Sequence, residues 1–185
     1  MPMMEINYLG HSCFKLKGKN VTIITDPFNP EMVGLKPGKQ SADIVTVSHQ
    51  HGDHNFVDLV KPKGDSLLVF DAPGEYETRN VDIRAWRTFH DDQKGAARGL
   101  NTIFQILVDG VNVVHLGDLG HVLDEKIVEE LGNVDVLMVP VGGYYTIDAV
   151  FAVKIVKQIE PRNVIPMHYY MAGMNSETFG DLSGI

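Results

Sequence analysis

Residues 48–55 read Ser-His-Gln-His-Gly-Asp-His-Asn. They contain the pattern His-x-His-x-Asp-His, formed by His49, His51, Asp53 and His54. Imidazole nitrogens and carboxylate oxygens are donors that divalent first-row metals prefer. The apolar run 44–47 precedes the pattern and predicts a buried strand that ends in a loop, where several side chains can converge. The stretch therefore predicts a metal site rather than a solvated, histidine-rich loop.

Composition limits the classes of protein and of partner. The chain has 185 residues, of which 44% are hydrophobic and 22% charged, as expected for a globular domain. Its net charge of -8 argues against a nucleic-acid partner, which needs clustered Lys and Arg. No apolar run is long enough to span a membrane, and the N-terminus does not resemble a signal peptide. Cys13 is the only cysteine, so we expect a cytoplasmic protein without an intrachain disulfide.

Hydrophobic periodicity predicts mostly strands first, then strands alternating with helices. Strands are expected at 5–9, 13–17, 21–25, 67–70, 81–86, 102–108, 111–116, 134–139 and 164–165. Helices are expected at 56–60, 122–131 and 148–159, and a loop at 29–42. Repeats, linkers and low-complexity segments are absent from the sequence, which predicts a single domain over residues 1–185.

Three further donors stand where a predicted strand ends: His90, Asp118 and His168. Each of them alone is more typical of a structural hydrogen-bonding group than of a metal ligand. Together with the opening motif they form a set of five histidines and two aspartates in one kind of context. The sequence therefore predicts that distant strand ends complete the metal site.

These motifs resemble the metallo-β-lactamase superfamily, on the segments 48–54, 89–91, 115–118 and 166–169. The segments 8–12, 25–28 and 73–77 are similar to one branch, the small cytoplasmic metal-dependent hydrolases related to ascorbate-6-phosphate lactonase. The resemblance covers about residues 4–170 and implies an α+β fold. This fold is an αββα four-layer sandwich, with two mixed β-sheets face to face, helices outside and the site at one sheet edge. Because relatives commonly continue further after the residue that corresponds to His168, a C-terminal element could be missing.

The resemblance also implies how the donors are shared. His49, His51 and His90 would hold one divalent ion. Asp53, His54 and His168 would hold a second, and Asp118 would bridge both. Zn is the first expectation for both ions, with Mn or Fe as alternatives.

The implied activity is that of a metal-dependent hydrolase with a binuclear centre. A metal-bridging hydroxide would cleave an ester-type bond in a lactone, phosphodiester or thioester. Asp53 is the candidate catalytic residue, which would orient this hydroxide and accept its proton. A metal-binding sensor or vestigial domain with little turnover is the alternative.

This chain differs from other branches of the superfamily in ways that exclude the reactions of those branches. Flavodiiron-type oxygen reductases carry a carboxylate where this chain has His51, and secreted β-lactamases use Cys where it has Asp118. Glyoxalase II-like thioesterases add a C-terminal helical domain, and transfer-RNA processing nucleases add a substrate-gripping arm. The resemblance therefore implies a minimal hydrolase acting on a small-molecule substrate.

Several residues near the motifs are candidates for supporting roles. Candidate substrate-binding residues are His121, Lys94, Arg98 and Tyr144. A cation after His90 could hold a substrate phosphate or carboxylate, so an anionic substrate is one option, although a solvated loop charge is the simpler interpretation. His11 and Asp26 are candidates for orienting the ligand histidines, which usually need a hydrogen-bond acceptor behind them. A homo-oligomeric state stays open.

Overall fold

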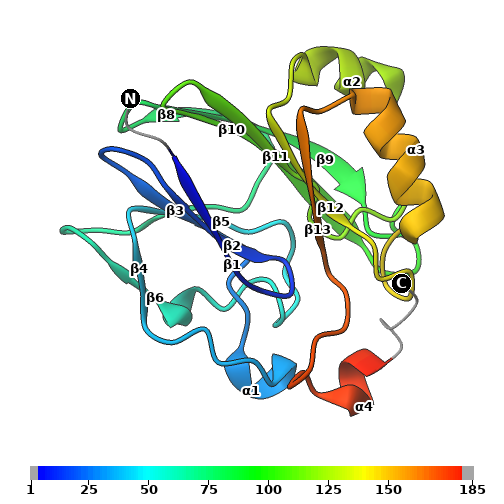
Figure 1. Cartoon of the computed structure of the whole chain (residues 1–185), viewed down its shortest axis with the longest axis horizontal. Helices are drawn as coiled ribbons and strands as arrows, with labels where there is room; N and C mark the ends of the chain where they lie inside the picture. The colour runs from blue at the N-terminus through cyan, green and yellow to red at the C-terminus, as the bar shows by residue number, and fades with distance from the viewer. Residues whose placement is uncertain (1–3, 181–185) are drawn as a thin grey trace.

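Two β-sheets face each other in the computed structural model, which describes residues 4–180 (Figure 1). The first sheet has the order β1-β2-β3-β5-β7, with β1 (Glu5–Gly10), β2 (Cys13–Lys17), β3 (Thr22–Thr25), β5 (Ile44–Thr46) and β7 (Leu68–Phe70). The second has the order β13-β12-β11-β10-β9-β8, with β8 (Gly74–Thr78), β9 (Val81–Phe89), β10 (Leu100–Val108), β11 (Val111–His115), β12 (Val136–Pro140) and β13 (Asn163–Met167). A separate pair joins β4 (Gln40–Ala42) to β6 (Val60–Pro62).

The main hydrophobic core lies between the two sheets. Phe14 and Ile23 of the first sheet belong to the same buried cluster as Ile83, Phe104 and Met138 of the second. All five are fully buried, and full burial of an apolar side chain of this size contributes about 1.5–3 kcal/mol. Alternate residues of β9 are buried, as expected for a strand with one face on a core. This shared core fixes the two sheets, and therefore the loops at their ends, relative to each other.

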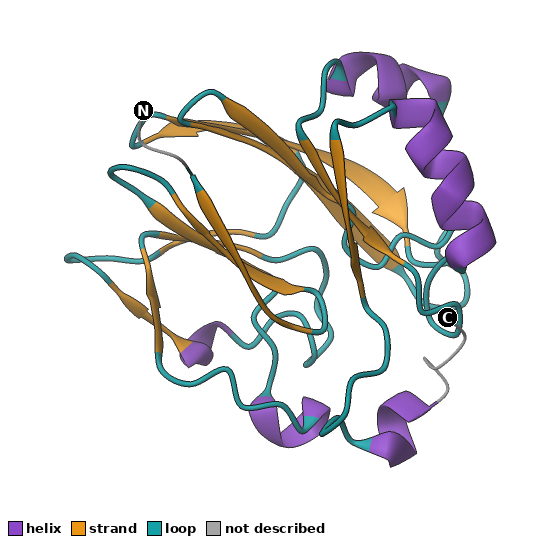
Figure 2. Ribbon diagram, in the orientation of Figure 1, coloured by secondary structure: helices purple, strands orange, loops and turns teal. Residues whose placement is uncertain are grey.

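Helices cover the outer faces of the sandwich unequally (Figure 2). The helices α2 (Glu125–Leu131) and α3 (Ala149–Ile159) pack on the second sheet through a cluster that includes Leu131 and Ile155. The first sheet is covered more thinly, by α1 (Pro30–Val33), the 3-10 turn η1 (Val57–Leu59) and the β4–β6 pair. The short helix α4 (Ser176–Phe179) contacts α1. The predicted α+β sandwich is confirmed, with a thin fourth layer.

Three local predictions were wrong. The expected loop at 29–42 contains α1, because the Asn29 side chain accepts hydrogen bonds from two backbone N–H groups and Pro30 occupies the first helical position. The expected helix at 56–60 is the 3-10 turn η1 followed by β6. No strand was expected between those at 67–70 and 81–86, but β8 lies there and pairs with β9. No helix within residues 4–180 is long and apolar enough to cross a bilayer.

The strand directions bring the predicted donors to one edge. β1 is antiparallel to β2, β2 is antiparallel to β3, and β3 is parallel to β5, so β1, β3 and β5 run the same way. By the same argument β9, β11, β12 and β13 share one direction in the second sheet. The loops that follow these strands therefore gather at one edge of each sheet.

Candidate metal centre

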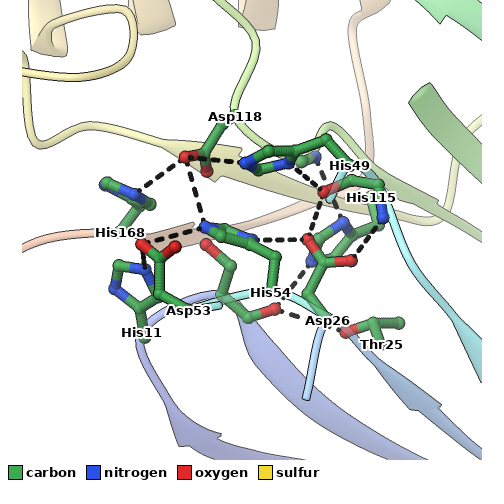
Figure 3. A network of polar contacts seen from close by, with 12 residues as sticks. His11, Thr25, Asp26, His49, Asp53, His54, His115, Asp118 and His168 are labelled. Carbon is green, nitrogen blue, oxygen red and sulfur yellow. Dashed lines mark hydrogen bonds and ion pairs between the residues drawn. The ribbon is translucent and has the colours of Figure 1, made fainter. Parts of the chain in front are cut away.

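The structure brings all seven predicted metal ligands together where these strands end. Figure 3 shows five of them, His49, Asp53, His54, Asp118 and His168. Three overlapping groups have ligand atoms within 4.8 Å of one another: His49 with His51 and His90; His49 with His54 and Asp118; and His11 with Asp53, His54 and His168. All of these residues except His51 are buried. The sequence motif and the distant strand ends thus form one continuous cluster with two donor-rich ends.

Asp118 lies at the centre of this cluster. Its Oδ2 atom is 3.1 Å from Nε2 of His168, 3.2 Å from that of His54, 3.3 Å from that of His90 and 3.8 Å from that of His49. Burial raises the pKa of the Asp118 carboxyl, but the imidazoles of His168 and His54 outweigh it and hold this pKa well below its usual range. A charged carboxylate among four imidazoles is a set of donors that suits divalent first-row metals.

Asp26 fixes the tautomers of two of these histidines. Its Oδ2 atom is 2.8 Å from Nδ1 of His54 and 2.6 Å from the Ser48 hydroxyl, while Oδ1 accepts the Ser48 backbone N–H. Because the Ser48 hydroxyl donates to the carboxylate, its oxygen accepts from Nδ1 of His49, at 2.9 Å. Both histidines therefore turn Nε2 toward Asp118, the arrangement in which a carboxylate orients a metal-binding imidazole.

Buried polar atoms without a hydrogen-bond partner gather at this site. Seven of the eleven such atoms within the described residues belong to the cluster, on His11, His49, His54, His90, Asp118 and both nitrogens of His168. Burying a polar atom without a hydrogen bond costs about 1–3 kcal/mol, so the concentration of such atoms needs an explanation. Burial lowers the pKa of His49 to about 3, which keeps its imidazole neutral, as metal binding requires. This donor set fits divalent cations.

His11, in the turn between β1 and β2, lies behind Asp53. Its Nε2 atom is 3.1 Å from Oδ2 of Asp53, and both residues are buried. His11, Asp26 and His168 also have φ angles of 56°, 40° and 56°, in the left-handed region that non-glycine residues rarely adopt. Such backbone costs on the order of 1–3 kcal/mol per residue and clusters at functional sites. The backbone N–H of His168 donates to the His11 carbonyl, which joins two of these strained positions.

Two supporting residues were missed by the sequence analysis. Asn101, fully buried in β10, accepts the Asp118 backbone N–H and donates to the Thr88 hydroxyl and to the Leu116 carbonyl. Phe179 of α4 packs its ring edge against His11, with 5.1 Å between ring centres. A buried amide inside an apolar strand is the only signal that could have pointed to Asn101, and no comparable signal marks Phe179.

Gly120 touches the backbone that carries His90. A Cβ atom added to Gly120 would contact the Asp91 backbone nitrogen and lie 2.5 Å from both the Asp91 Cα and the His90 carbonyl carbon. We expect Gly120→Ala to lower the free energy of unfolding by about 1–3 kcal/mol, as overpacking does, and to lower metal content because His90 moves. Denaturant titration and elemental analysis measure the two effects. Gly64→Ala, whose Cβ would meet nothing within 4 Å, is the control, and equal effects of the two variants would contradict the prediction.

A cavity of about 540 Å³ opens directly on the donors, with His51, Asp53, His90, Asp118 and Arg98 in its wall. We call it the metal-site cavity. A neighbouring hollow of about 510 Å³, the side cavity, shares Arg98 with it and is also lined by His121 and Tyr144. Lys94 lines neither cavity. The donors are therefore accessible to a small molecule.

The candidate substrate-binding residues differ in what their side chains already contact. Nε2 of His121 accepts the Phe89 backbone N–H at 3.1 Å, and Nδ1 lies 2.7 Å from the Val122 carbonyl oxygen. Both ring nitrogens of His121 are thus engaged by the backbone. Tyr144 is 49% exposed, and Arg98 points its guanidinium at the Tyr144 carbonyl. Of the four candidates, Arg98 alone lines the metal-site cavity.

Comparison with known proteins agrees with this geometry. The family model described as "Beta-lactamase superfamily domain" matches residues 5–168. A "UPF0173 metal-dependent hydrolase" from Archaeoglobus fulgidus is 31% identical over 194 residues, covering 90% of this chain and 83% of the relative. A protein of the metallo-β-lactamase superfamily from Thermotoga maritima, described as a candidate Zn-dependent hydrolase, superposes with a TM-score of 0.74 at 39% identity, covering 92% of this chain and 78% of its own.

A further solved structure, Igni18, is a metallo hydrolase from Ignicoccus hospitalis. It superposes with a TM-score of 0.72 at 26% identity, covering 97% of this chain and 85% of its own. The relation to ascorbate-6-phosphate lactonase stays a prediction. With a family match over most of the sequence, relatives of this similarity and His/Asp groups able to bind metal, the chain belongs to the metallo-β-lactamase superfamily and is a metal-dependent hydrolase.

Proposed function

We propose that the chain is a binuclear hydrolase that cleaves an ester-type bond, such as that of a lactone, phosphodiester or thioester. The single observation that carries this proposal is the position of the Asp118 carboxylate, which contacts imidazoles from both donor-rich ends of the cluster. In the proposal, His49, His51 and His90 would hold one ion, and Asp53, His54 and His168 would hold the other. Asp118 would serve as a ligand to both.

The ions, with Zn as the first candidate and Mn or Fe as alternatives, would supply a Lewis acid for the substrate oxygen and lower the pKa of a water molecule near them. Asp53 then accepts the proton of the attacking water. Its Oδ2 atom is held by Nε2 of His11 at 3.1 Å, which leaves the second carboxylate oxygen for this task. His11 and Asp53 come from loops of the same sheet, so Asp53 is fixed before substrate binds.

The test combines metal content with hydrolysis. Elemental analysis of the purified protein is expected to give about two divalent ions per chain, and the His51→Ala variant should contain fewer. The wild type should hydrolyse at least one member of a panel of lactones, thioesters and phosphodiesters, lose this activity with a chelator and regain it with Zn²⁺. One ion per chain that His51→Ala leaves unchanged would exclude the binuclear centre. Two ions with no turnover on the panel would favour a sensor or vestigial domain.

A further inference from the structure

The loop after His90 is wound around one buried carboxylate. Oδ1 of Asp91 accepts the backbone N–H groups of Gln93 and Gly95, both at 2.8 Å. Oδ2 accepts those of Ala97 at 2.9 Å and Arg98 at 2.7 Å. Asp91 is 4% exposed, so these four charge-assisted bonds are largely shielded from water. The carboxylate therefore fixes the path of the loop up to Arg98.

The Arg98 side chain is held at the mouth of the metal-site cavity. Its Nη2 atom donates to the Tyr144 carbonyl at 3.1 Å, and its guanidinium carbon lies 5.7 Å from the centre of the Tyr145 ring. These two contacts use one N–H donor of the guanidinium and one of its faces. A guanidinium has five N–H donors, so donors remain for a ligand on the cavity side.

The charge of Arg98 stands out in its surroundings. Among the described residues that line the metal-site and side cavities, Arg98 is the only one with a permanent positive charge. It forms no ion pair with any residue from 4 to 180. In a chain with a net charge of -8, an arginine that is positioned but left without a carboxylate partner is suited to an anion from outside. The side cavity is lined by the carboxylates of Asp91, Asp92 and Asp148. The two carboxylates of the metal-site cavity, Asp53 and Asp118, are proposed metal ligands whose charge bound cations would offset, so an anion is favoured on the metal-site side of Arg98.

We propose that Arg98 binds an anionic group of the substrate, a carboxylate or a phosphate, while the scissile bond lies at the metal donors in the same cavity. This inference rests on the proposed function and narrows its substrate class to esters that carry a second, negatively charged group. Guanidinium binds both kinds of anion through paired N–H donors, which a lysine ammonium cannot reproduce.

The test compares two esters with the same leaving group, neutral 4-nitrophenyl acetate and anionic 4-nitrophenyl hemisuccinate. For the metal-loaded protein, Arg98→Ala is expected to lower kcat/KM for the hemisuccinate by about 10- to 100-fold, the loss of a hydrogen-bonded charge pair. This loss should come mainly from a higher KM, and kcat/KM for the acetate should change little. Arg98→Lys should recover only part of the kcat/KM for the hemisuccinate. Arg87→Ala removes an exposed arginine of β9 that lines neither cavity, and it should behave as wild type.

A binding measurement separates failure of this inference from failure of the proposed function. Succinate and inorganic phosphate are titrated into metal-loaded wild type and Arg98→Ala by calorimetry, and the anion that loses affinity in the variant identifies the preferred group. If both esters are hydrolysed with an unchanged preference in Arg98→Ala, the inference is overturned and the hydrolase stands. If neither ester is hydrolysed but Arg98→Ala weakens anion binding, the anion site stands and the ester function fails. Equal affinity of the two proteins for both anions overturns the anion site.

Discussion

Asp118→Asn should remove most of the bound metal and lower kcat/KM at least about a thousandfold. This is the largest fall in kcat/KM that we expect from any single substitution. The amide keeps the volume of the side chain but not the negative charge that Oδ2 presents to four imidazoles at 3.1–3.8 Å. In the proposed binuclear centre, each donor-rich end would keep three side chains, but the two cations would lose the anion between them. Elemental analysis should find less than one ion per chain.

The same variant should lose the stabilisation that metal gives to the fold. A ligand present at a thousandfold excess over its dissociation constant adds about 4 kcal/mol to the free energy of unfolding. Adding Zn²⁺ to metal-free protein should therefore raise the melting temperature of the wild type clearly and that of Asp118→Asn little. Asp124→Asn makes the same chemical change at an exposed position without a side-chain cap bond and serves as the control. Full metal content in Asp118→Asn would mean that Asp118 does not bridge.

The distant donors were predictable from the sequence because each of them follows a strand. His90, Asp118 and His168 are far apart in the chain, but each comes shortly after a strand whose apolar residues, continuous or alternating, indicate that it is buried. Since β9, β11 and β13 share one direction, their ends had to meet at one edge. The direction itself followed from the family resemblance and not from the local pattern.

The supporting contacts could not be predicted in the same way. Asn101 acts across three strands, because its amide joins Thr88 on β9 to the loop that carries Asp118. Nothing near Asn101 in the sequence marks those partners. The Asp91 loop is similar: an aspartate next to a histidine indicates nothing about four backbone N–H groups folding back on it. Long-range packing decides such roles, and a single sequence contains no signal for it.

Asp53→Asn should have the second-largest effect, a fall in kcat of about 10²- to 10⁴-fold, the usual contribution of a general base. The Asp53 carboxylate lies in the wall of the metal-site cavity. Nε2 of His11 holds one of its oxygens, and Nε2 of His54 lies 3.6 Å from the same atom. An asparagine side chain can keep the contact with His11 through its carbonyl oxygen, but it cannot accept a proton.

Metal content decides between the two roles proposed for Asp53, as ligand and as proton acceptor. If Asp53→Asn still contains about two ions at saturating Zn²⁺ while kcat falls, the loss belongs to proton transfer. If one ion is lost in parallel with kcat, Asp53 acts chiefly as a ligand. Asp58→Asn, an exposed position in η1, should retain both ions and full kcat. Wild-type kcat in Asp53→Asn would exclude this carboxylate as the proton acceptor, because its oxygens would then be dispensable for the chemistry at the metal-site cavity.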